Sequence, residues 1–199
     1  MDEQVRSIPP IATADRAAHR NIQEIARRAV PALADFAVVF MVAGRSIVGI
    51  ASAHVSPTGD RLLRALQRIY RIRRNDLQST VAQVIRTGRP SLRRSIHDDG
   101  QPAPRGSVAD LHRRLGCRSA LVLPIRVGPI VAGAITLCYA GSGRSYAPVD
   151  LAGAQRIVRE ITRTVVPLPI PHAAAQRLRA AVGDARRHTA VRRRVAARN

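Results

Sequence analysis

Lysine is absent from this sequence of 199 residues, so all 33 basic residues are arginine. Without lysine the chain cannot form a lysine Schiff base with a carbonyl substrate. It also cannot contain the phosphate-binding P-loop of nucleotide hydrolases, which requires a lysine. Aromatic residues make up only 3% of the chain, and tryptophan is missing. This scarcity argues against a surface that stacks the bases of single-stranded nucleic acids.

Cysteine is also scarce: Cys117 and Cys138 are the only two, too few for a zinc ribbon or a disulfide framework. We expect buried thiols in a reducing compartment, and an enzyme that uses one of them is the weakest hypothesis. No apolar run reaches the roughly 18 residues of a membrane span, and the N-terminus lacks a signal-peptide pattern. The sequence therefore predicts a soluble, cytoplasmic protein.

Acidic residues are few: 13 of them against 33 arginines give a formal net charge of +20. The charge is densest in residues 167–199, which carry eight arginines and one acidic residue. Such a field favours nucleic acid, an acidic protein surface or anionic lipid as partner, but an arginine-rich, solvated surface gives the same pattern. The candidate polyanion contacts are Arg186, Arg187, Arg192, Arg193 and Arg194.

The hydrophobic residues, 46% of the chain, alternate between helical and extended spacing along the sequence. Two pairs of apolar runs are each joined by a short glycine-containing turn, which is typical of β-hairpins. The predicted order is helix 15–30, strands 36–42 and 46–54, helix 60–70, a helix from 76 or 79 to 87, strand 91–96, loop 97–106, helix 107–116, strands 117–127 and 130–140, and helix 148–166.

Hairpins imply antiparallel pairing, so this order predicts the α+β fold class. Residues 14–166 form the predicted domain, after a flexible lead at 1–13. Three prolines within 167–171 end the last helix of the domain. They separate it from an arginine-rich C-terminal tail, 167–199, which is helix-prone but has only a weak apolar face.

Six stretches in this order resemble the GAF domain family: LADFAVVFMV, GIASAHVSP, VIRTGRP, LGCRSALVLPI, IVAGAITL and RSYAPVDL. The resemblance covers residues 20–166 and rests on the ordered set, including Gly88, Pro124, Gly133, Tyr146 and Asp150. It implies a central antiparallel sheet with the first and last helices on one face and a small-molecule pocket with short helices on the other. Family members commonly dimerise through these two terminal helices.

The sequence departs from the family members whose ligands have recognisable motifs. The Asn-Lys-Phe-Asp-Glu motif of the cyclic-nucleotide-binding members cannot exist in a chain without lysine. The Asp-Ile-Pro signature and placed cysteine of the bilin-binding members are missing. The two cysteines do not match the thiol pattern of the members that reduce free methionine sulfoxide. The resemblance therefore assigns neither a ligand nor a cofactor.

Five residues are candidates for lining the pocket. They are His54, Tyr70, Arg94, His97 and Tyr139. His54 ends a predicted strand and either contacts an anionic ligand or is a partly buried structural histidine. His97 stands beside Asp98 and Asp99, but consecutive residues seldom aim at one point, so we expect no metal. The arginine runs at 71–74 and 93–94 either line an anion site at the pocket mouth or are solvated.

The two terminal helices carry narrow apolar stripes at near-heptad spacing. Such a stripe can pack on the sheet of its own chain, on a partner helix, or on both. The candidate dimer residues are Ile22, Ile25, Ala29, Leu151, Val158, Ile161 and Val165. The sequence thus predicts a non-enzymatic, homodimeric sensory module that binds a small molecule or a signalling protein. A nucleic-acid or other polyanion-binding protein is the alternative.

Overall fold

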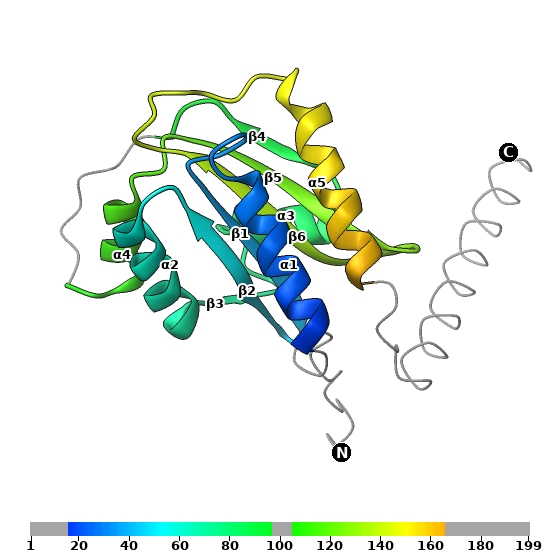
Figure 1. The fold of residues 1–199 in the computed structure, drawn as a ribbon. Coiled ribbons are helices and arrows are strands. Elements are labelled where there is room, and N and C mark those ends of the chain that lie inside the picture. Colours follow the sequence, from blue (N-terminus) through cyan, green and yellow to red (C-terminus); the bar gives the residue numbers. More distant parts are fainter. Residues whose placement is uncertain (1–15, 97–104, 166–199) are drawn as a thin grey trace, which may run out of the picture. The chain divides into compact units, whose positions relative to one another are not determined.

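The computed structural model describes residues 16–96 and 105–165, drawn in colour in Figure 1. The predicted lead at 1–13 and tail at 167–199, with its five candidate arginines, lie outside these residues. The elements are α1 (Arg16–Ala29), β1 (Phe36–Ala43), β2 (Ser46–His54), α2 (Pro57–Ile69), β3 (Arg71–Arg73), α3 (Thr80–Thr87), β4 (Ser91–Arg93), α4 (Val108–Leu115), β5 (Ser119–Val127), β6 (Ile130–Tyr139) and α5 (Asp150–Val165).

The strands form one antiparallel sheet in the order β3-β2-β1-β6-β5-β4. The β1–β2 and β5–β6 pairs are the two hairpins expected from the sequence, and β1 joins them because it also pairs with β6. Phe36 is opposite His54 on one side and Cys138 on the other. The fold class predicted from the sequence is confirmed.

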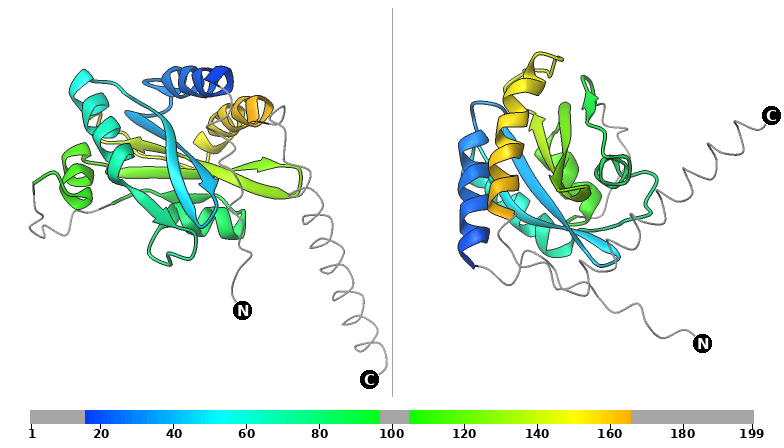
Figure 2. Two further views of the ribbon diagram at one scale, coloured as in Figure 1. Left: turned by 90° about the horizontal axis from the view of Figure 1, so that it is seen from below. Right: turned by 90° about the vertical axis from the view of Figure 1, so that its right-hand side faces the viewer.

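Helices cover both faces of the sheet (Figure 2). On one face α1 and α5 pack on alternate strand residues such as Val39, Ile135 and Leu137. On the other face α2, α3 and α4 pack over Phe40 and Val122 and their neighbours. Because successive strand residues point to opposite faces, both layers of the core are built from the same strands.

Serine side chains and glycines set the ends of the short helices. Ser56, Ser79 and Ser107 cap α2, α3 and α4, each accepting a hydrogen bond from a backbone N–H in the first turn. Gly88 and Gly116 follow α3 and α4 with φ of 67° and 61°, a left-handed conformation that favours glycine. None of the helices in the described ranges is long and apolar enough to cross a membrane.

Several bounds differ from the sequence prediction: β4 ends at Arg93 rather than at residue 96, β5 begins at Ser119 rather than at 117, and α5 begins at Asp150 rather than at 148. Helix α2 begins at Pro57 rather than at residue 60, because Ser56 caps it and proline fits the first helical position. Strand β3 was not predicted: Ile72 is buried while Arg71 and Arg73 are exposed. A three-residue strand is too short to show an alternating pattern, and its pairing with the edge of β2 stabilises it.

Candidate functional site

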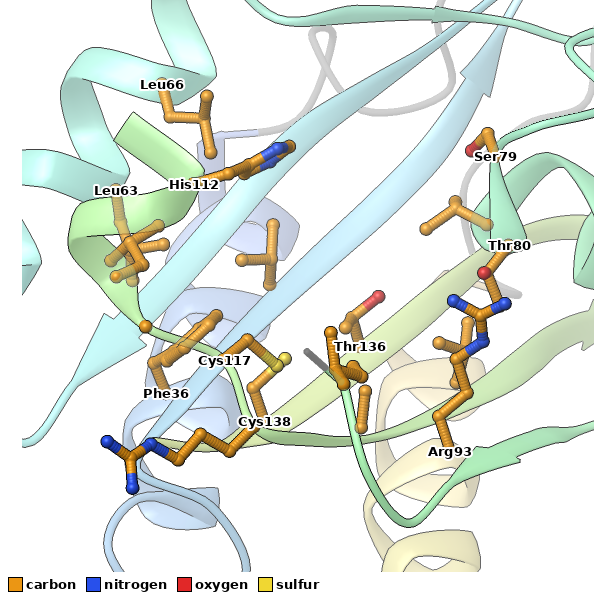
Figure 3. Close-up of a pocket in the computed structure, with 18 of the residues that line it drawn as sticks. Phe36, Leu63, Leu66, Ser79, Thr80, Arg93, His112, Cys117, Thr136 and Cys138 are labelled. Carbon is orange, nitrogen blue, oxygen red and sulfur yellow. The ribbon is translucent and has the colours of Figure 1, made fainter. Parts of the chain in front are cut away.

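A cavity of about 1160 Å³ lies on the face of the sheet covered by α2, α3 and α4 (Figure 3). Strand alternation supplies its floor, since every second residue of β1, β5 and β6 points to this side. The floor residues are Phe36, Val38, Phe40, Ala120, Val122, Thr136 and Cys138. Leu63 and Leu66 of α2 and Leu115 of α4 add apolar walls, so the cavity offers a mostly hydrophobic interior.

Positive charge gathers in the wall of this cavity. Arg93 and Arg94 come from β4 and the residue after it, Arg113 from α4, and Arg118 from the segment before β5. No aspartate or glutamate lines the cavity among the residues that the structure describes. The nearby Asp76 accepts hydrogen bonds from the backbone N–H groups of Gln78 and Ser79 at 2.9 and 3.2 Å instead. The described wall is therefore net cationic.

Thr136 and Gln67 each bring to the lining a buried polar atom that has no hydrogen-bond partner among the described residues. One is Oγ1 of Thr136, in the middle of the otherwise apolar floor. The other is Nε2 of Gln67 on α2, whose Oε1 accepts a hydrogen bond from Oγ of Ser52 at 3.2 Å. Because a buried polar group without a partner costs free energy, these atoms mark places where a ligand could complete the hydrogen bonding.

Tyr70 and His112 form an aromatic pair in the cavity wall. Their rings meet edge to face with centroids 5.0 Å apart. Burial raises the pKa of the Tyr70 phenol, helped by the charge of Asp76, and burial lowers the pKa of the His112 imidazole. At neutral pH both rings are therefore uncharged, and they add aromatic surface rather than charge.

The two cysteines also meet in this cavity. Cys117 and Cys138 both line it close to each other, and the Cys117 thiol donates a 3.5 Å hydrogen bond to the carbonyl of Ser119. Cys138 is buried and Cys117 is half-buried. Burial and the neighbouring Cys117 thiol raise the pKa of Cys138 well above its ordinary value, so this thiol stays protonated. The expectation of buried thiols therefore applies fully to Cys138 and partly to Cys117.

The structure separates the pocket candidates that the sequence grouped together. Tyr70 and Arg94 line the cavity, as does Arg93. His54 lies at its edge, outside the lining: its ring stacks on Phe36 at 5.7 Å, and its Nδ1 accepts a hydrogen bond from the Ser56 N–H. Arg71 and Arg73 are exposed on β3 and, like Arg74, do not line the cavity. Residue 97 lies outside the described ranges.

Tyr139 points to the opposite face of the sheet from the cavity. Its ring stacks on Tyr146 with centroids 4.3 Å apart, and the Arg144 guanidinium lies 4.4 Å from its centroid. The Tyr146 hydroxyl donates a 2.6 Å hydrogen bond to the carbonyl of Leu33. Tyr139 thus packs against the connection between β6 and α5. Its neighbour Cys138 takes the position that faces the cavity.

The candidate dimer residues pack inside their own chain. The described structure buries most of them between the terminal helices and the sheet: Ile22, Ile25, Ala29, Ile161 and Val165. Leu151 and Val158 are partly buried against the same cluster. An ion pair of 2.6 Å between Arg28 and Glu160 joins α1 to α5. The apolar stripes therefore serve the sheet of the same chain, and only their margins are exposed.

The sequence matches a model of the GAF domain over residues 18–165. The chain belongs to the GAF domain family. Domains of this family are generally sensory or regulatory modules that bind small molecules. This match spans both layers of helices and every strand of the sheet, so the cavity described above lies wholly inside the matched region.

Solved structures share the fold at low sequence identity. The GAF-B domain of DevS from Mycobacterium smegmatis is 19% identical, with a TM-score of 0.53, covering 80% of this chain and 97% of that one. A GAF domain/HD domain protein from Geobacter sulfurreducens is 12% identical, with a TM-score of 0.57 and coverage of 79% and 95%. Type II free methionine-R-sulfoxide reductase from Thermoplasma acidophilum is 12% identical, with a TM-score of 0.51 and coverage of 75% and 92%. No curated protein matches the sequence.

Several lining residues escaped the sequence analysis. Thr136 is the only serine or threonine in the apolar run of β6, and that isolation is a usable signal. The contact between Cys117 and Cys138 depends on the register in which Ala120 pairs with Cys138, which spacing alone does not reveal. His112 lies in the short helix α4, and only the tertiary structure shows which side of this helix faces the cavity.

Proposed function

We propose that this chain is a sensory or regulatory module of the cytoplasm that binds a small molecule in the cavity under α2, α3 and α4. The single observation that carries the proposal is a largely apolar cavity of about 1160 Å³ containing unpartnered polar atoms of Thr136 and Gln67. A volume and lining of this kind fit a small organic ligand. The proposal assigns the chain no catalytic residue.

The signal in this proposal passes through the sheet. On β6, Thr136 and Cys138 face the cavity, whereas Ile135 and Leu137 pack under the terminal helices. A ligand that shifts the floor strand therefore acts on the packing of α1 and α5 without contacting them. A ligand changes the population of the helix arrangement only as far as it binds one arrangement more tightly than the other.

Native mass spectrometry of the purified full chain tests the binding function. The expected result is an excess mass that disappears after denaturation and is absent in Ala120→Leu, which fills the floor. Ala152→Leu, on the exposed side of α5, is the matched control and should retain the bound mass. Equal loading of the two variants would show that the bound molecule does not occupy the cavity.

The proposal includes a homodimer formed through the outer margins of α1 and α5. Leu151, Ile157 and Val158 are partly exposed there and offer an apolar margin on α5. Size-exclusion chromatography with light scattering measures the mass directly. Leu151→Gln with Val158→Gln should convert a dimer to a monomer, and Leu77→Gln, an exposed apolar residue far from these helices in sequence, should not.

A second function, binding of nucleic acid or another polyanion, is favoured by the exposed surface of the same two helices. The exposed arginines on it are Arg16, Arg20, Arg27, Arg28, Arg156, Arg159 and Arg163. Its two glutamates already form ion pairs, Glu24 with Arg27 at 3.6 Å and Glu160 with Arg28 at 2.6 Å. The remaining guanidinium groups give this surface a positive field that attracts phosphates. A polyanion and a second copy of the chain would compete for it.

A further inference from the structure

Three arginines of the cavity wall come from two neighbouring segments of chain. Strand β4 pairs with β5 so that Arg93 is opposite Ala120. Beyond this pair, the N–H of Ile96 donates a 2.7 Å hydrogen bond to the carbonyl of Arg118. Arg93, Arg94 and Arg118 therefore lie on adjacent backbone segments, and all three line the cavity.

Other residues of the lining are apolar. Phe36, Leu63 and Leu66 lie across from Arg93 in Figure 3, with Thr136 between them on the floor. An occupant of this space meets both guanidinium groups and hydrocarbon. Guanidinium groups prefer carboxylate, sulfonate and phosphate oxygens, which they bind through paired N–H donors.

We propose that the cavity takes an organic anion, in which acidic groups face arginines of the wall and an apolar body lies over Phe36 and Leu66. This inference rests on the proposed function, because it names the chemical class of the ligand for the same cavity. The hydroxyl of Thr136 donates to or accepts from a polar atom on the body of the ligand. Asp98 and Asp99, next in sequence to this wall, lie outside the described residues.

Two fluorescent probes with the same aromatic body test the charge preference. One is 8-anilinonaphthalene-1-sulfonate, which carries a sulfonate, and the other is N-phenyl-1-naphthylamine, which is neutral. Each probe is titrated into the full chain and into two double variants. Arg93→Gln/Arg118→Gln removes two charges from the cavity wall, whereas Arg61→Gln/Arg68→Gln removes two from the exposed side of α2.

The cavity variant should bind the sulfonate probe about tenfold more weakly than the unaltered chain, since charge-assisted hydrogen bonds are lost. Its affinity for the neutral probe should change less than about twofold, because the neutral probe has no charged group for the arginines to bind. The α2 variant, with the same net charge, should bind both probes as the unaltered chain does. Equal weakening of the sulfonate probe by both variants would overturn the inference, because binding would then follow net charge alone.

Alkylation of Cys117 by iodoacetamide reports where the probes bind, since this half-buried thiol lines the cavity. Both probes should slow the reaction. Protection by both probes with no effect of Arg93→Gln/Arg118→Gln would overturn the anion preference while leaving the proposed function standing. Protection by neither probe would remove the cavity as a ligand site and with it both proposals. If the cavity variant does not fold, the salt dependence of probe binding to the unaltered chain tests the inference instead. Only the sulfonate probe should lose affinity as salt is raised. An equal loss of affinity for both probes would count against the inference.

Discussion

The carboxylate of Asp35 accepts a 2.7 Å hydrogen bond from the backbone N–H of Ala140, 105 residues later in the chain. A second bond of 2.9 Å comes from the N–H of Ser142. Asp35 immediately precedes β1, and Ala140 immediately follows β6, so this side chain joins the two central strands at one end of the sheet. Burial alone would raise the pKa of Asp35, but the hydrogen bonds from Ser142 and Ala140 and the charge of Arg144 hold it below the ordinary value.

Asp35→Asn should lower the free energy of unfolding by about 2 kcal/mol at pH 7, the scale of a buried charge-assisted hydrogen bond. Because the folded-state pKa of Asp35 lies below the ordinary value of 3.8, its contribution is complete above that pH and disappears as the pH falls through the folded value. Urea unfolding at several pH values should therefore show the two proteins converging in acid. Glu24→Gln, at an exposed ion pair, should change stability by less than about 0.5 kcal/mol.

Gly133 allows β1 and β6 to approach closely. A Cβ at this position would lie 2.2 Å from the carbonyl oxygen of Phe40 and 2.6 Å from Sδ of Met41. We expect Gly133→Ala to destabilise the domain by about 3 kcal/mol, since backbone cannot move aside as a flexible side chain can. Gly141→Ala is the matched control, because nothing lies within 4 Å of its Cβ. A thermal unfolding midpoint shared by both variants would contradict the argument.

The sequence predicted the parts of this fold that local spacing determines. Both hairpins and both terminal helices follow from periodicity that holds over eight or more residues. Strand β3 escaped because only Ile72 distinguishes it from a run of solvated arginines. The predicted start of α2 at residue 60 was wrong because proline usually interrupts regular structure, whereas Pro57 after Ser56 is a preferred first helical residue.

The site was harder to predict because both faces of the sheet are buried. Cys138 and Tyr139 are neighbours in an apolar strand, and their sequence does not say which of them faces the cavity and which faces the terminal helices. Only the packing of α2, α3 and α4 decides that Cys138 lines the cavity. His54 could not be placed from the sequence either, because its position depends on its contacts. Its ring stacks on Phe36 and accepts a hydrogen bond from the Ser56 N–H, and it lies outside the cavity lining.

Two buried hydroxyl groups of this domain should respond in opposite ways to removal. Oγ of Ser119 donates to the carbonyl of Arg93 and accepts from the N–H of Tyr146, both at 2.9 Å. Ser119→Ala should therefore cost about 2 kcal/mol, because a buried N–H and a carbonyl lose their partner. Thr136→Val removes a hydroxyl without a partner among the described residues, so stability should stay unchanged or rise by about 1 kcal/mol. Denaturant unfolding of both variants checks this, and a large loss in Thr136→Val would reveal a hydrogen bond to that hydroxyl.

The two thiols should react at different rates despite their contact. Burial and the Cys117 thiol raise the pKa of Cys138 well above its ordinary value, which suppresses the reactive thiolate. Cys117 is half-buried, so iodoacetamide should alkylate it first and should reach Cys138 only as the domain opens. Peptide mass spectrometry over time measures both rates. Cys117→Ser keeps Cys138 buried and should leave it slow, whereas rapid alkylation of Cys138 in this variant would show that Cys117 shields it.

Binding of duplex DNA would distinguish the second candidate function from general attraction to a basic protein. Arg156→Gln/Arg159→Gln/Arg163→Gln removes three exposed charges from α5, and Arg61→Gln/Arg64→Gln/Arg68→Gln removes three from α2. If the surface of α1 and α5 contacts phosphates, the α5 variant should bind more weakly and lose about one unit of salt slope per contact removed. The α2 variant should keep the slope of the unaltered chain, measured by fluorescence anisotropy between about 0.05 and 0.2 M salt. Equal losses in both variants would assign the binding to net charge, and deletion of residues 167–199 then measures how much of it the tail supplies.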